Sequence, residues 1–213
     1  MPLGGKPMVE WSIAAFRACD SVGSIVVAGP PGHSHDFEGD DLDVVEGGAT
    51  RAQSVSNALG QVETELVAIH DAARPLVTPG LIEGVVATLV NNPDQAGAIA
   101  ATPVTDTIKH VDSGSKDRFS MSGMENRSFV VVSTLERDRL WAAQTPQAFR
   151  VEALREALAA DPGRPGSATD EAMLVEAVGG KVLIHPSTAE NLKVTTPLDL
   201  KLAEVLLAER SAQ

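Results

Sequence analysis

Apolar and polar residues alternate along the first half of the chain in two distinct patterns. Runs with apolar residues at helical spacing, such as Met8, Trp11 and Phe16, are separated by short apolar runs typical of buried strands. The expected order is helix 7–19, strand 25–28, strand 43–46, helix 51–61, strand 66–70 and helix 79–91, with Thr78 as cap and Pro79 as first residue of the last helix. Strands that alternate with helices predict a mostly parallel sheet between two helical layers, an α/β fold of Rossmann-like type.

The second half continues this alternation around one irregular stretch. The expected elements there are strand 97–102, helices 151–160, 169–178 and 197–209, and strand 181–184. Residues 107–137 show no helical period; two β-rich runs flank a polar tract, which predicts a protruding β-hairpin arm. A long hairpin is unstable alone, so we expect this arm to pack against a second copy of the chain. Its polar tip, 113–128, is expected to be disordered.

A strand of buried type ends in charged side chains at His70, Asp71 and Arg74. Ligands of open α/β sheets bind in the crevice outside the carboxyl ends of the strands. Asp71 is therefore a candidate to hold a metal ion or a ribose, and Arg74 a phosphate. An Asp that caps a local turn beside a solvated Arg would give the same string. We expect His70 to be buried and hydrogen-bonded, without a role in proton transfer.

Composition narrows the class of protein. The chain has 213 residues, 43% of them hydrophobic, which is enough for one sizeable core. A formal net charge of −12 argues against nucleic-acid binding, because such proteins cluster cations to neutralise phosphates. Four cations near the motifs therefore stand out as candidates for a pocket that takes a small anionic substrate: Arg74, Lys109, Arg137 and Lys193.

Cysteine content and hydropathy bear on the compartment. The single cysteine, Cys19, excludes an intramolecular disulfide and makes a cysteine zinc site implausible. No window approaches the ~18 apolar residues of a membrane span, and the opening residues lack the apolar stretch of a signal peptide. We therefore expect a cytoplasmic protein without membrane contact.

Five motifs in a fixed order carry a family resemblance. They are HDAARP at 70–75, PVTDTIK at 103–109, LWAAQTPQAF at 140–149, TDE at 169–171 and NLKVT at 191–195. Together they resemble the bacterial and plastid 2-C-methyl-D-erythritol 4-phosphate cytidylyltransferases, from about residue 1 to 209. The resemblance implies a three-layer nucleotidyltransferase domain formed by 1–106 and 138–213, with 107–137 as an arm that interlocks two protomers.

The same resemblance implies an activity and roles for individual residues. The activity is transfer of CMP from CTP to 2-C-methyl-D-erythritol 4-phosphate, with release of pyrophosphate, in non-mevalonate isoprenoid biosynthesis. The implied residues are Gly48, Ser54, Asp71 and Ala72 for the nucleotide, Asp71 and Asn191 for Mg²⁺, Arg74, Thr107 and Thr145 for the acceptor, and Arg137 and Lys193 as catalytic cations. Each of these residues also has a purely structural alternative. These alternatives are a turn glycine, an ordinary helical serine, Asp and Asn residues that cap turns, and solvated surface cations. Ala49 stands where family members often carry an Asp, which puts base recognition by that side chain in doubt.

One family segment has no counterpart here. Roughly thirty residues, including the first strand and a glycine-rich loop that cradles the triphosphate, precede the PLGGKP segment in the family. Residues 4–6 lack the spacing of a phosphate-binding loop, and Pro7 is expected to begin the first helix. The difference reflects either a misassigned start or a real loss. Two alternatives stay open. Because this loop has no counterpart, the chain is alternatively an inactive fragment. Because a related family shares much of the DAARP motif, the acceptor is alternatively ribitol 5-phosphate.

Overall fold

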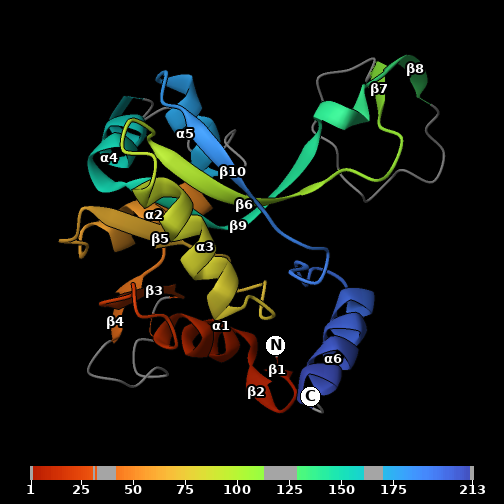
Figure 1. Cartoon of the computed structure of the whole chain (residues 1–213). Coiled ribbons are helices and arrows are strands. Elements are labelled where there is room, and N and C mark those ends of the chain that lie inside the picture. The colour runs from red at the N-terminus through yellow and green to blue at the C-terminus, as the bar shows by residue number, and fades with distance from the viewer. Residues whose placement is uncertain (1, 31, 33–41, 113–128, 161–169, 212–213) are drawn as a thin grey trace. The chain divides into compact units, whose positions relative to one another are not determined.

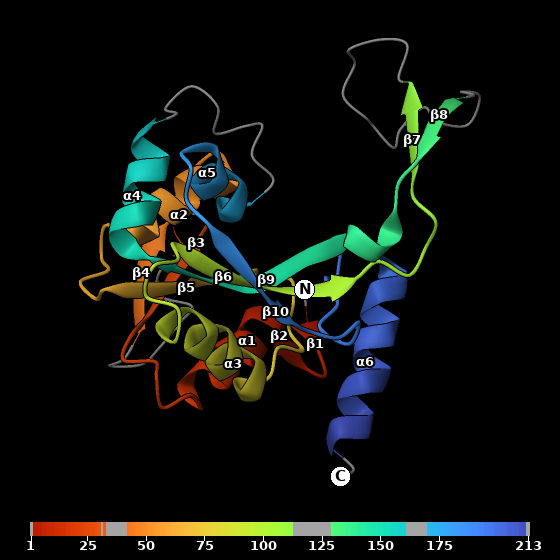
Figure 2. The same cartoon turned by 45° about the horizontal axis from the view of Figure 1, so that its top comes forward.

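The structure is a computed structural model that describes residues 2–30, 32, 42–112, 129–160 and 170–211. Its elements (Figures 1 and 2) are β1 Pro2–Leu3, β2 Lys6–Pro7, α1 Met8–Arg17, β3 Ile25–Gly29, β4 Leu42–Glu46, α2 Arg51–Leu59, β5 Leu66–Ile69, α3 Pro79–Val90, β6 Gly97–Pro103, β7 Lys109–Asp112, β8 Val130–Thr134, η3 Arg137–Arg139, β9 Trp141–Arg150, α4 Val151–Ala160, α5 Glu171–Ala177, β10 Val182–Pro186 and α6 Pro197–Ser211. The chain divides into two compact units, Met1–Ala101 with Ala143–Gln213, and Thr102–Ala142. No described helix is long and apolar enough to cross a bilayer.

A four-stranded sheet forms the centre of the first unit, in the order β10-β6-β9-β5. β10 pairs with β6 in parallel, whereas β5 pairs with β9 in antiparallel register, with Val67 opposite Phe149. β3 and β4 form a separate parallel pair. The sequence analysis missed β9, because the buried polar residues Gln144, Thr145 and Gln147 interrupt the apolar pattern of this strand. The expected mostly parallel sheet is therefore a mixed one.

Side chains of alternate residues in β6 pack on opposite faces of the sheet. Ile99 belongs to a core cluster with residues of α4 and α5, which also holds the fully buried Phe149. Ala98 and Ala100 belong to a cluster with Val85 and Leu89 of α3. Helices therefore cover both faces of the sheet, and the predicted three-layer α/β architecture is confirmed.

Capping side chains set the starts of three helices. Thr78 accepts a hydrogen bond from the Leu81 N–H at the start of α3, as predicted, and Thr50 does the same for Gln53 in α2. Asp170 caps α5 by accepting from the Met173 N–H. Pro7 was expected to be the first residue of α1, but it pairs with Pro2 in the β1–β2 hairpin and precedes the helix, which begins at Met8.

The second unit contains the hairpin of β7 and β8. The two strands pair in antiparallel register, with an irregularity between His110 and Val111. Val130, Val131 and Val132 of β8 are 73%, 54% and 59% exposed. The predicted hairpin is therefore present, and the predicted arm 107–137 lies inside this unit. Its tip, 113–128, lies outside the described residues.

Candidate active site

Asp71 is the centre of a cluster of charged side chains at the carboxyl end of β5. Its Oδ1 accepts from Nε of Arg51 at 3.0 Å, and its Oδ2 accepts from Nζ of Lys193 at 2.8 Å. Burial opposes ionisation of this carboxyl, but the hydrogen bond from Lys193 and the charge of Arg51 outweigh it and hold the pKa of Asp71 below its ordinary value. Asp71 is therefore a charged group held between two cations, Arg51 and Lys193.

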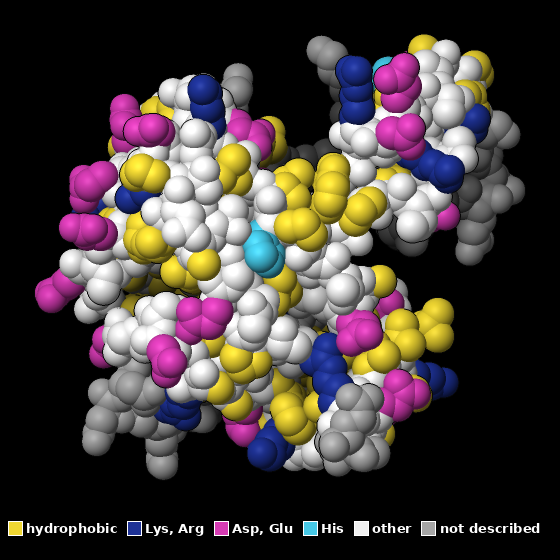
Figure 3. Space-filling view, viewed as in Figure 1, with side chains coloured by type: hydrophobic (Ala, Val, Ile, Leu, Met, Phe, Trp, Pro, Cys, Tyr) yellow, Lys and Arg dark blue, Asp and Glu magenta, His cyan; other side chains and the backbone are white. Residues whose placement is uncertain are grey.

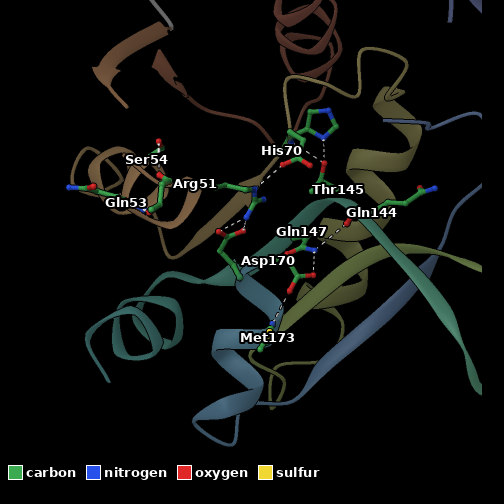
Figure 4. A network of polar contacts seen from close by, with 12 residues as sticks. Arg51, Gln53, Ser54, His70, Gln144, Thr145, Gln147, Asp170 and Met173 are labelled. Carbon is green, nitrogen blue, oxygen red and sulfur yellow. Dashed lines mark hydrogen bonds and ion pairs between the residues drawn. The ribbon is translucent and has the colours of Figure 1, made fainter. Parts of the chain in front are cut away.

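Arg51 connects this cluster to Glu171, a buried acid of the TDE motif to which the sequence analysis assigned no role in the site. Its Nη1 donates to both carboxylate oxygens of Glu171, at 2.6 and 2.5 Å, from the first turn of α2 (Figure 4). Glu171 is 1% exposed, and Arg51 is the salt-bridge partner that the described structure gives it. Burial lowers the pKa of Arg51, but the hydrogen bond to Glu171 more than offsets this and the net pKa is raised.

A sequence signal for Arg51 does exist. A cation in the first turn of a helix is unfavourable, because the helix dipole places partial positive charge there. Arg51 begins α2 directly after its cap, Thr50, and Glu171 begins α5 directly after Asp170. An arginine at such a position requires acidic partners from elsewhere in the fold, and Asp71 and Glu171 supply them.

His70 and Thr145 fix the backbone on which Asp71 stands. The Asp71 N–H donates to Thr145 Oγ1 at 3.0 Å, and that hydroxyl lies 3.0 Å from Nδ1 of His70 (Figure 4). His70 Nε2 lies 3.1 Å from the carbonyl oxygen of Arg74, so Nε2 carries the proton and Nδ1 accepts. Burial lowers the pKa of His70 to about 4. Thr145, predicted to touch the acceptor, is 3% exposed and holds the turn at residue 71.

Arg74 and Asn191 join the loop after β5 to the loop before α6. Arg74 Nη1 donates to the carbonyl oxygen of Asn191 at 2.7 Å, and the Val194 N–H donates to the carbonyl oxygen of Ala73 at 2.7 Å. Burial lowers the pKa of Arg74, partly offset by the charge of Asp71. These contacts place Lys193 beside Asp71.

Gly48 and Ser54 are in direct contact. The Gly48 N–H donates to Ser54 Oγ at 2.9 Å, and that hydroxyl donates to the carbonyl oxygen of Thr50. A Cβ on Gly48 would lie 2.3 Å from Cγ of Gln53, whose amide oxygen accepts from the Ala49 N–H. The loop between β4 and α2 therefore requires glycine at this position, and its side-chain contacts orient Ser54. Ala72, the fourth residue predicted for the nucleotide, is exposed next to Asp71.

Arg137 and Thr107 belong to the second unit. Arg137 lies in η3, and its Nη1 donates to the carbonyl oxygen of Thr105 at 2.9 Å. Thr107 is exposed in the loop between β6 and β7, and Lys109 donates to Thr134 across the hairpin. Residues 105–107 and Arg137 are therefore neighbours within the second unit.

The two residues predicted to bind Mg²⁺ differ in how well they fit that role. Asp71 supplies one carboxylate, and proteins commonly bind Mg²⁺ through one or two carboxylates together with substrate phosphates. Asn191 is 3% exposed, and its amide nitrogen donates to Gln144 Oε1 and to the Thr145 carbonyl oxygen. Within the described part of the chain, no group of three or more His, Cys, Asp or Glu side chains could hold a metal. The geometry of Asp71 fits a Mg²⁺ shared with a polyphosphate, and Asn191 has a buried Oδ1 without a hydrogen-bond partner among the described residues.

Comparison with known proteins decides the family. The model of the 2-C-methyl-D-erythritol 4-phosphate cytidylyltransferase family matches residues 1–209. This chain belongs to that family. A cytidylyltransferase of this name from Thermosynechococcus vestitus is 42% identical over 223 residues, covering 100% of this chain and 88% of the relative. The crystal structure of the cytidylyltransferase from Thermus thermophilus has a TM-score of 0.77 and 34% identity, and covers 96% of this chain and 90% of that chain.

Other cytidylyltransferase relatives are fused to a second enzyme. IspD is the short name of this family. A bifunctional IspD/IspF enzyme from Anaeromyxobacter dehalogenans is 36% identical over 96% of this chain, which spans 51% of that relative. The family assignment made from the five sequence motifs is therefore confirmed, together with its α/β cytidylyltransferase fold.

Proposed function

We propose that this cytidylyltransferase transfers CMP from CTP to 2-C-methyl-D-erythritol 4-phosphate. A phosphate oxygen of the acceptor attacks the α-phosphorus of CTP, and the bond from that phosphorus to the bridging oxygen breaks to release pyrophosphate. The observation that carries the proposal is the family match over residues 1–209, with the motif residues Asp71, Arg74 and Lys193 gathered at one sheet edge. Arg51, which lies outside the motifs, contacts Asp71 there.

The charges of these groups suit the reaction. Lys193 is 42% exposed, so its ammonium can leave Asp71 and move to a phosphate of the substrate. Arg51 stays in place, because Glu171 holds its guanidinium. Arg137 and Thr107 would contact the acceptor phosphate, and Gly48 and Ser54 the nucleotide. Preorganised cations of this kind stabilise the negative charge that develops during phosphoryl transfer.

Mg²⁺ would be held by Asp71 and phosphate oxygens of CTP, where it supplies charge neutralisation and orients the triphosphate. Asp71 is suited to this role because its pKa is lowered and the carboxyl is ionised at neutral pH. Asn191 would act indirectly, by placing Arg74 and Lys193 through its carbonyl oxygen and its neighbours in the loop.

We also propose that the protein is a homodimer assembled through the β7–β8 hairpin. Apolar side chains are visible on this unit in Figure 3, and Val130, Val131 and Val132 are all more than half exposed. Val131→Glu should therefore shift the protein from dimer to monomer in light scattering, whereas the acidic-to-neutral change Asp138→Asn in η3 should not. A monomeric parent protein would refute this assembly.

The activity itself is tested by acceptor choice. Release of pyrophosphate from CTP should depend on 2-C-methyl-D-erythritol 4-phosphate and should be at least ~10-fold faster with it than with ribitol 5-phosphate, because the acceptor must be oriented for in-line attack. The measurement is a coupled pyrophosphate assay, with product mass confirmed by mass spectrometry. A preference for ribitol 5-phosphate would replace the proposed acceptor.

A further inference from the structure

Helix α6 packs on the loops of the candidate active site and lies beside β1 (Figure 1). In the described part of the chain, the three other core clusters, which hold the strands of the sheet and the remaining helices, contain no α6 residue. The cluster of α6 instead takes side chains from β1, from the loop after β5 and from the loop before α6, among them Leu3, Leu76, Leu192 and Val194. The helix therefore supports the two loops that carry the charged groups of the site.

Residues 190–196, which we call the Lys193 segment, have side chains that point in alternate directions around Lys193. Leu192 and Val194 pack in the cluster of α6, and Val194 is 4% exposed. Lys193, between them, extends to Asp71, where its Nζ donates to Oδ2 at 2.8 Å. This is the pattern of an extended segment, whose successive side chains point to opposite sides. α6 therefore lies behind the segment, and Lys193 points away from the helix toward Asp71.

The first turn of α6 holds the chain on one side of Lys193. Oδ2 of Asp199 accepts from the N–H groups of Thr195 and Thr196, at 2.9 and 2.7 Å, and from Thr195 Oγ1 at 2.9 Å. The hydrogen bonds from Thr195 and Thr196 lower the pKa of Asp199 to about 2, so this carboxyl is ionised at neutral pH. Asp199 thereby fixes the backbone two residues after Lys193.

The last turn of α6 holds the chain on the other side of Lys193. Nη2 of Arg210 donates to Oε2 of Glu190 at 3.1 Å, and Nη1 donates to the Leu76 carbonyl oxygen at 2.7 Å. Leu76 lies two residues after Arg74, in the loop after β5. One guanidinium therefore ties the Lys193 segment to the loop after β5.

The two attachments lie far apart along α6. Asp199 and Arg210 are separated by eleven positions of the helix, which is about 16 Å along its axis. The chain between Glu190 and Thr195 spans at most about 18 Å when it is fully extended. The Lys193 segment is therefore held along the length of α6, with Lys193 in the middle.

We propose that α6 positions the Lys193 segment, with Arg210 as the positioning residue that joins it to the loop after β5. The inference rests on the proposed function, in which Lys193 is a cation of the transfer reaction. Misplacement of a catalytic group by about 1 Å can lower a rate by about 100-fold, so a residue that touches no substrate can control turnover. Without Arg210 the two loops would still be joined by the contacts of Val194 and Arg74, so we expect a partial loss.

Arg155 offers a matched control outside the site. Its Nη1 donates to Oε1 of Glu152 at 2.9 Å and its Nη2 to the Val62 carbonyl oxygen at 3.0 Å, the same two kinds of contact that Arg210 makes. The Arg155 side chain is 46% exposed and that of Arg210 is 32% exposed. Replacement by Met removes one ion pair and one hydrogen bond to a carbonyl oxygen in either case. A purely structural role of Arg210 therefore predicts similar losses in the two variants.

The test compares Arg210→Met with Arg155→Met in two measurements. Turnover of CTP with 2-C-methyl-D-erythritol 4-phosphate should fall by about ten-fold or more in Arg210→Met, with CTP affinity within a few-fold, and stay within about two-fold in Arg155→Met. Hydrogen exchange at the Val194 amide, which donates to the loop after β5, should become about ten-fold faster in Arg210→Met alone. Exchange at the Val151 amide, which donates to the residue before β5, should change equally in the two variants.

A double variant tests whether Arg210 acts through Lys193. In a Lys193→Ala protein, Arg210→Met should lower turnover by less than about two-fold, because the cation that it positions is already gone. A second ten-fold loss would overturn the proposal. If Arg210→Met does not fold by circular dichroism, Glu190→Ala removes only the exposed partner of the pair and should lower turnover about three-fold, whereas the control Glu152→Ala should not.

The possible failures can be told apart. Equal effects of the two arginine variants on turnover and on Val194 exchange would give Arg210 a structural role and overturn the proposal, as would unchanged Val194 exchange in Arg210→Met. A parent protein without turnover would refute the proposed function. In that case Val194 exchange still decides whether Arg210 holds the Lys193 segment.

Discussion

The Arg51–Glu171 ion pair should stabilise the protein in a markedly asymmetric way. Glu171 is 1% exposed, whereas the Arg51 side chain is 34% exposed and also bonds Asp71. Arg51→Met leaves a buried carboxylate without a counter-charge, and removal of one partner from a buried pair typically costs about 3–5 kcal/mol. Glu171→Gln leaves a cation that still has Asp71 and some water, so it should cost about 1–2 kcal/mol, the scale of a lost charged hydrogen bond.

The double variant Arg51→Met/Glu171→Gln gives the sharper measurement. With both charges gone, no unpaired carboxylate is buried, so the double variant should be more stable than Arg51→Met alone. Urea unfolding of the four proteins yields the coupling free energy between the two positions. Glu152→Gln is the matched control: its pair with Arg155 is on the surface, and it should change stability by less than about 1 kcal/mol. The reasoning fails if Glu171→Gln costs more than Arg51→Met, or if the two effects add within about 0.5 kcal/mol.

The remaining predictions concern pH and the two cations proposed to be catalytic, Lys193 and Arg137. The pKa of His70 is lowered from 6.5 to about 4, so the unfolded chain binds this proton more readily than the folded protein. The free energy of unfolding should therefore fall as pH drops from about 6.5 to about 4, by at most about 3 kcal/mol. In urea unfolding at several pH values, His70→Asn should remove this part of the pH dependence. Lys193→Ala should lower acceptor turnover by ~100-fold while CTP affinity, measured by calorimetry, stays within a few-fold and stability within about 1 kcal/mol. Arg137→Ala should show the same split between turnover and nucleotide affinity; intact turnover in either variant would return that residue to an ordinary surface cation.

Much of the fold follows from local patterns. Apolar period and capping chemistry are properties of a few neighbouring residues, so α3, with Thr78 as cap, and α4, over Val151–Ala160, begin at the residues expected from the sequence. β9 could not be recognised in this way. Gln144 and Gln147 are buried there because loop and helix partners satisfy their amides: Gln144 donates to the Thr188 carbonyl oxygen and Gln147 to Asp170. Those partners are far away in sequence, so the local string looks polar.

The candidate site also contains residues that the sequence identified and residues that only the folded structure brings together. Asp71, Arg74 and Lys193 were predicted because their motifs identify them, and the structure brings Asp71 and Lys193 into contact. Arg51 and Glu171 are 120 positions apart, and their pairing exists only once α2 and α5 have packed. The family resemblance implied Asn191 as a metal ligand; in the structure its amide nitrogen is hydrogen-bonded inside the fold, and its Oδ1 has no hydrogen-bond partner among the described residues. The motifs therefore indicated which groups belong to the site, and the contacts of each group come from the folded structure.

Asp71 binds two cations, Arg51 and Lys193, whose side chains differ in how easily they can move. This difference explains how a phosphate can be bound beside a carboxylate. A substrate anion competes with Asp71 for cations, and a single fully exposed partner would leave the carboxylate unbalanced when it moved. Lys193, which is 42% exposed, can move to the phosphate. Arg51 cannot follow easily, because Glu171 holds its other nitrogen inside the protein, and it remains as the counter-charge of Asp71. The arrangement predicts that loss of Lys193 affects mainly turnover, while loss of Arg51 affects mainly stability.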